Sequence, residues 1–86
     1  MLDKNKNNWI ELIYLTNSIH KSMKNFYFQS PLERLIYKKS NYILDCSENA
    51  TMCLEMNEII EYKGKWLELL LKSPKIEVIE SIISFL

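Results

Sequence analysis

Glycine and histidine are almost missing from this 86-residue chain, which contains one residue of each. A single glycine excludes the glycine-rich loops that hold phosphate groups and the fingerprint of dinucleotide-binding folds. The lone histidine, His20, lies beside the apolar stripe of a predicted helix, so we interpret it as a structural or surface residue. The sequence therefore predicts a protein that is not an enzyme, with no catalytic residue and no cofactor.

Residues that bind metal ions are also scarce. Cys46 and Cys53 are too few for a disulfide framework, and no further Cys/His pair completes a zinc site, so we expect free, partly buried thiols. Glu55, Glu58 and Glu61 follow one another at intervals of three, but a second helix offers no matching acidic pair. We expect these carboxylates to form a solvated helix face, and we predict no metal site.

Long apolar runs are absent, and so is an amino-terminal signal. No stretch approaches the roughly 20 apolar residues that span a bilayer. Residues 1–8 are mostly polar, and neither an apolar segment nor a small-residue cleavage site follows them. The sequence thus predicts a cytoplasmic location and no membrane partner.

What the chain does contain is apolar residues at helical spacing, and they predict an all-α bundle in a single domain over residues 1–86. The sequence from Ser30 to Glu33, with Pro31 between them, is typical of a helix start because Ser30 can accept the amide of Glu33. Ser73-Pro74 repeats this start. The predicted helices cover about 8–28, 31–45, 47–72 and 74–86.

The third helix is the ambiguous one. Gly64 either breaks it or lies inside it at a cost of about 1 kcal/mol relative to alanine. Apolar and polar residues alternate near Met52, so an α+β alternative places a β-hairpin in residues 50–72, with its turn at Lys63-Gly64-Lys65.

The net charge of zero conceals a division between the two halves of the chain. Residues 1–43 carry seven basic and three acidic groups, and residues 44–86 carry four and eight. Basic residues flank an aromatic cluster in the first half, which is typical of surfaces that bind nucleic acid. A nucleic-acid-binding regulator is therefore the alternative function, and the partner-binding candidates are Phe26, Tyr27, Phe28, Arg34 and Lys38, with Lys39 beside them.

The apolar surface exceeds what a core of this size hides, so the sequence predicts a protein partner and a homodimer. We expect a stoichiometric protein-binding module, such as a phage or mobile-element inhibitor or regulator of a larger host enzyme or defence complex. The residues predicted at the dimer or partner interface are Trp66, Leu70, Ile79, Ile82, Ile83 and Phe85.

Overall fold

The computed structural model describes residues 4–24, 30–48, 53–71 and 76–84, and it confirms the all-α prediction. Four helices follow one another: α1 (Lys4–Lys24), α2 (Pro31–Glu48), α3 (Met56–Leu71) and α4 (Ile76–Ile83). The described segments contain no strand. None of the helices in these segments is long and apolar enough to cross a membrane.

Two helices begin at side-chain caps. The Glu33 amide donates a hydrogen bond of 3.2 Å to Ser30 Oγ, which confirms the start predicted for α2. At α3, the Glu55 amide donates a hydrogen bond of 3.2 Å to Glu58 Oε1, so the Glu58 side chain caps the first turn of the helix. Ser73 lies outside the described residues, and α4 begins at Ile76.

Gly64 lies inside α3, so the helix continues through the one position where the sequence allowed a break. The hairpin alternative is wrong for the described part of residues 50–72. Lys63, Gly64 and Lys65 occupy successive positions of the helix there and do not form a turn. Residues 49–52 lie outside the described segments, and α2 extends to Glu48, three residues beyond its predicted end.

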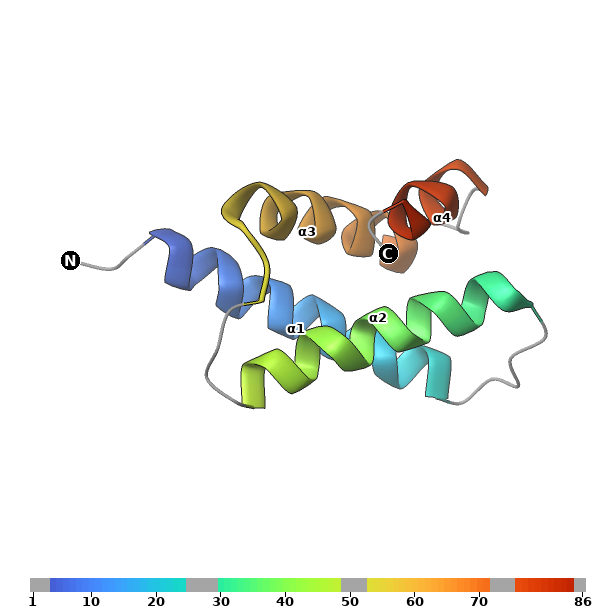
Figure 1. Cartoon of the computed structure of the whole chain (residues 1–86), viewed down its shortest axis with the longest axis horizontal. Helices are drawn as coiled ribbons and strands as arrows, with labels where there is room; N and C mark the ends of the chain where they lie inside the picture. The colour runs from blue at the N-terminus through green and yellow to red at the C-terminus, as the bar shows by residue number, and fades with distance from the viewer. Residues whose placement is uncertain (1–3, 25–29, 49–52, 72–75, 85–86) are drawn as a thin grey trace.

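The helices pack in two layers, with α1 and α2 below and α3 and α4 above in the view of Figure 1. α1 contacts α2 and α3, while α4 contacts α2 and α3. α1 and α3 run in the same direction in Figure 1, and α2 returns between them along the chain. All four helices and the segment before α3 contribute to one buried core: Leu12, Ile19, Ile36, Ile43, Leu54, Ile59, Tyr62, Trp66 and Ile82.

The buried face of α3 differs from the predicted one. The apolar spacing placed Ile59 and Trp66 on one stripe together with Ile60 and Leu67. Ile59 and Trp66 are buried, and Tyr62, which the stripe did not include, is buried with them. The helix carries more apolar residues than one face holds, so their spacing alone does not fix its rotation. As a result Ile60 and Leu67 remain exposed.

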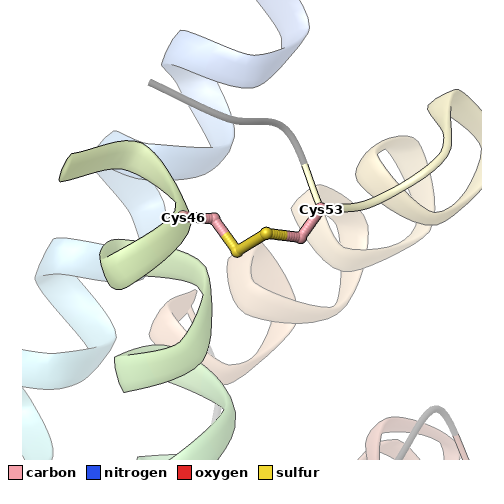
Figure 2. Close-up of a disulfide and its surroundings, with 2 residues drawn as sticks. All are labelled: Cys46 and Cys53. Carbon is pink, nitrogen blue, oxygen red and sulfur yellow. A yellow bond between two sulfur atoms is a disulfide. The ribbon is translucent and has the colours of Figure 1, made fainter. Parts of the chain in front are cut away.

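The prediction of free thiols is wrong, because Cys46 and Cys53 form a disulfide (Figure 2). Cys46 is buried near the end of α2, and Cys53 lies in the segment leading into α3. Their Cα atoms are 6.0 Å apart, which is an ordinary separation for this bond. The bond ties the end of α2 to the segment that leads into α3, and the spacing of the two cysteines gave no sign of it.

Candidate functional site

An apolar groove runs between α1 and α3 on the outside of the bundle. It has a volume of about 660 Å³. Large apolar side chains that the core leaves exposed line it, and Tyr14 is the most open of them at 72% exposure. The residues that line the groove are Ile10, Glu11, Tyr14 and Leu15 from α1 and Ile60, Lys63, Gly64 and Leu67 from α3.

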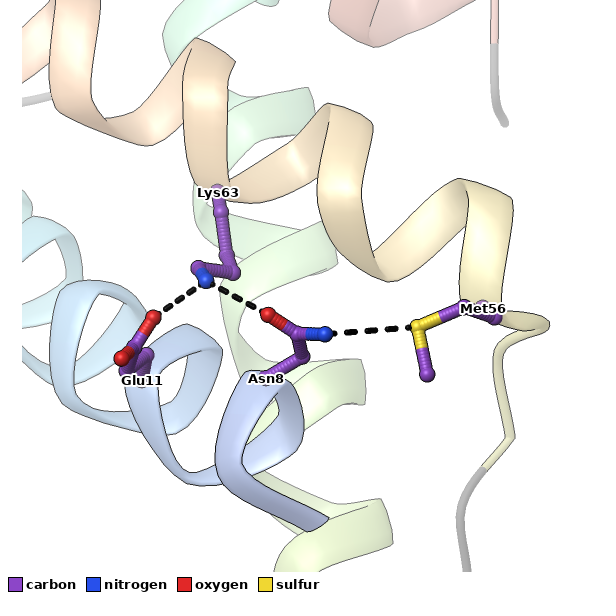
Figure 3. A network of polar contacts seen from close by, with 4 residues as sticks. All are labelled: Asn8, Glu11, Met56 and Lys63. Carbon is purple, nitrogen blue, oxygen red and sulfur yellow. Dashed lines mark hydrogen bonds and ion pairs between the residues drawn. The ribbon is translucent and has the colours of Figure 1, made fainter. Parts of the chain in front are cut away.

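A polar network joins α1 to α3 along the groove (Figure 3). Lys63 Nζ forms an ion pair with the Glu11 carboxylate and donates a hydrogen bond to Asn8 Oδ1 at 2.9 Å. Asn8 Nδ2 in turn lies 3.6 Å from the sulfur of Met56. The network therefore adds a polar link between the two helices beside the groove.

Gly64 opens the groove on the α3 side. A methyl group built at its Cα would meet nothing within 4 Å beyond its chain neighbours and the backbone of its own helix, so the space above this position is open. Ile60 lies one turn before Gly64 and Leu67 one turn after it, and both are exposed. Leu71 continues this face by a further turn and is 72% exposed.

An acidic hollow of about 440 Å³ adjoins the groove on the side of α3 and α4. Ile60 and Gly64 line both spaces, so the two are neighbours along α3. Three residues with carboxylates and one with an ammonium group are among those that line the hollow: Glu61, Glu68, Glu77 and Lys65. Lys65 Nζ donates to the Ser81 carbonyl at 3.2 Å, so it lies against the start of the last turn of α4.

Two residues predicted at the interface lie in the interior. Trp66 and Ile82 are both 0% exposed, so neither offers surface to a partner in this structure. Ile79 is half-buried and packs against the core, while Leu70 is exposed. Phe85 and the side chain of Ile83 lie outside the described residues. On α4, Ile82 belongs to the core of the chain, and Val78 and Ile79 pack against that core.

The basic and aromatic cluster predicted in the first half is only partly described. Phe26, Tyr27 and Phe28 lie outside the described residues. Arg34 and Lys38 are both exposed and lie one turn apart on α2. Lys39 does not join them, because its side chain is turned inward and only 8% of the residue is exposed.

Lys39 is the most unusual polar residue of the core. Its Nζ lies 4.8 Å from the ring centre of Tyr42 and 5.4 Å from that of Tyr62, at distances typical of cation–π contacts. Burial lowers the pKa of Lys39, and the carboxylate of Glu58 opposes this shift. Burial also raises the pKa of Tyr62, with Glu58 and Glu61 adding to the effect. Lys39 lines neither the groove nor the acidic hollow, so we assign it a structural role.

The remaining candidates for chemistry have structural contacts. The His20 ring stacks on Tyr37 with their centres 4.7 Å apart, and its Nδ1 lies 3.2 Å from Ser40 Oγ. Ser40 donates to the Tyr37 carbonyl at 2.7 Å. Within the described ranges, no three His, Cys, Asp or Glu side chains gather where they could hold a metal ion.

The chain matches no known protein family, no curated protein and no solved structure.

Proposed function

We propose that this protein is a stoichiometric protein-binding module that uses the groove between α1 and α3. The observation that carries the proposal is the line of exposed apolar side chains on both walls, Ile10 and Tyr14 on one and Ile60 and Leu67 on the other. Monomeric proteins rarely leave large contiguous apolar patches exposed unless a partner covers them. A concave site of this kind buries the side chains that a partner inserts. Such fully buried side chains contribute most of the binding energy of an interface.

We also propose that the protein is not an enzyme. The groove offers apolar surface and one paired Lys63–Glu11 charge, and this composition suits recognition better than proton transfer or nucleophilic attack. Inhibition or regulation of a larger host enzyme or defence complex, as expected of a phage or mobile-element protein, is the form of recognition that we favour. Nucleic-acid binding receives less support, because burial of Lys39 removes one cation from the predicted basic surface.

The disulfide bears on the cellular location. Such bonds persist in oxidising compartments and are rare in the cytoplasm, where thiols are kept reduced. The Cys46–Cys53 bond therefore weighs against the cytoplasmic location predicted from the sequence, and we do not include that location in the proposal.

A comparison of two matched variants tests the proposal. Leu67 in the groove and Tyr42 on α2 are each 46% exposed, so Leu67→Glu and Tyr42→Glu place the same charge at equally open positions. Each variant is immobilised beside the wild-type protein and exposed to extract from the native host. We expect a protein that the wild type and Tyr42→Glu retain in equimolar amount and that Leu67→Glu loses. Equal retention by all three, or by none, contradicts the proposal.

Self-association needs a separate measurement, because a second copy of the chain would also cover the groove. Sedimentation of the wild type and Leu67→Glu at several concentrations distinguishes a homodimer through the groove from a monomer. A dimer that Leu67→Glu dissociates supports the homodimer predicted from the sequence. A dimer that persists in Leu67→Glu uses another surface.

A further inference from the structure

The shape of the groove selects a helix as its occupant. α3 presents Ile60, Gly64, Leu67 and Leu71 at intervals of four, three and four residues, which is one continuous helical face. At 1.5 Å per residue this face extends for about 16 Å. An amphipathic helix anchors in such a groove through apolar residues at the same spacing. An added strand would instead need an open sheet edge, and the described segments contain no sheet.

The charges beside the groove differ between its two borders. On the side of α3 and α4, the acidic hollow supplies Glu61, Glu68 and Glu77, and all three are exposed. On the α1 side, the exposed residues Lys6 and Lys21 lie on the same helical face as Ile10 and Tyr14. On α1 the Glu11 carboxylate, which lines the groove and pairs with Lys63, offsets these lysines, so the clearest excess of charge beside the groove is the negative charge of the hollow.

A second copy of this chain fits the groove poorly. If the grooves of two copies faced each other in a dimer, two concave surfaces would meet and leave an unfilled space between them. The basic face of α2 has Arg34 and Lys38, but Tyr42 is the only large apolar residue of the described α2 surface that is exposed. One such residue does not supply the row of apolar anchors that the groove accommodates. The described surface of α2 therefore matches the groove less well than an amphipathic helix of another protein does.

We propose that the groove binds an amphipathic helix of another protein that carries lysine or arginine along the edge facing α4. This inference rests on the proposed function and specifies the partner. The apolar stripe of the occupant packs over Gly64 between Ile60 and Leu67. Its basic edge lies beside Glu61 and Glu68, where complementary charge accelerates association and fixes the direction in which the helix lies.

A displayed library of helical peptides tests the proposal without knowledge of the natural partner. The peptides keep apolar residues at i, i+4, i+7 and i+11, and the flanking positions are drawn equally from Lys, Glu and Ser. The library is selected on the wild type, on Glu61→Lys/Glu68→Lys, and on Asp45→Lys/Glu48→Lys. Asp45 and Glu48 are exposed on α2 away from the groove, so the last variant has the same net charge and serves as the control.

We expect lysine to outnumber glutamate about tenfold along one edge of peptides selected on the wild type and on the control, which corresponds to about 1.4 kcal/mol. On Glu61→Lys/Glu68→Lys the preference should disappear or invert, and competition by salt should weaken it on the wild type. Circular dichroism establishes that each variant keeps its helices.

The other outcomes separate the inference from the proposed function. If the selected peptides lose binding to Leu67→Glu but carry lysine and glutamate equally often along their edges, the charge preference is wrong and the groove remains a binding site. If no peptide binds although a host protein is retained through Leu67, the helical occupant is wrong and the proposed function stands. A homodimer that Leu67→Glu dissociates makes a second copy the occupant and also overturns the inference.

Discussion

Replacing Gly64 with alanine should stabilise the protein. Gly64 lies inside α3, where glycine costs about 0.8–1.0 kcal/mol relative to alanine because its backbone loses more conformational freedom on folding. The added methyl group meets no atom within 4 Å, so no clash reduces the gain. The position is exposed, so burial of the methyl adds little. We therefore expect the free energy of unfolding to rise by about 1 kcal/mol.

Urea denaturation followed by far-UV circular dichroism measures this change. With a urea m-value of about 1–3 kcal/mol/M, the midpoint should rise by about 0.3–1 M while the slope stays the same. The melting temperature should rise by about 4–8 °C for a protein of this size. Glu68→Ala is the control, since Glu68 is exposed one turn later in the same helix and already has a favourable helix propensity. An unchanged or lower midpoint for Gly64→Ala refutes a continuous helix through this position.

Three further predictions concern the contacts that hold the helices in place. The Cys46–Cys53 bond closes an eight-residue loop, and its reduction should lower the free energy of unfolding by about 2.5 kcal/mol through loop entropy. Urea midpoints with and without reductant measure this change. The double alanine variant is the control, and its midpoint should not respond to reductant. Lys63→Met should lower the free energy of unfolding by about 0.5–1 kcal/mol, because it removes the hydrogen bonds from a half-buried ammonium group to α1. Glu11→Gln, at the more exposed end of the ion pair, should lower it by less. Equal stability of Lys63→Met and the wild type in urea would contradict this. Because burial lowers the pKa of Lys39 in the folded state, the unfolded chain binds more protons between that pKa and 10.5. The free energy of unfolding of the wild type, compared with that of Lys39→Met, should therefore rise as the pH approaches 10.5. Urea titrations at several pH values measure this difference. A difference that stays flat or falls across this range would count against a buried ammonium group.

The helices were predictable where one local signal decides the structure. The Ser30 cap fixed the start of α2 because its hydrogen bond forms within four residues. The rotation of α3 was not predictable in the same way. Ile59 and Ile60 are equally apolar, and only the packing of Tyr62 and Trp66 against the other helices decides which of the two is buried.

Features that depend on distant parts of the chain could not be read from spacing. The Cys46–Cys53 bond requires a particular path between α2 and α3, and seven residues of separation permit many paths. The sequence placed Lys39 beside Arg34 and Lys38 on a basic surface, but its ammonium group lies over the ring of Tyr62 on another helix. The groove was missed because Ile10 and Tyr14 lie outside the predicted stripe of α1, and this excess of apolar residues was the available signal.

The two walls of the groove come from residues about fifty positions apart, Ile10 on α1 and Ile60 on α3. Neither wall exists as a binding surface in the unfolded chain, so any ligand of the groove binds only folded molecules. Occupancy and stability are then thermodynamically linked: a ligand at a hundred times its dissociation constant adds about 2.7 kcal/mol to the free energy of unfolding. By the same linkage, a substitution far from the groove weakens apparent affinity once it leaves a substantial fraction of the chains unfolded.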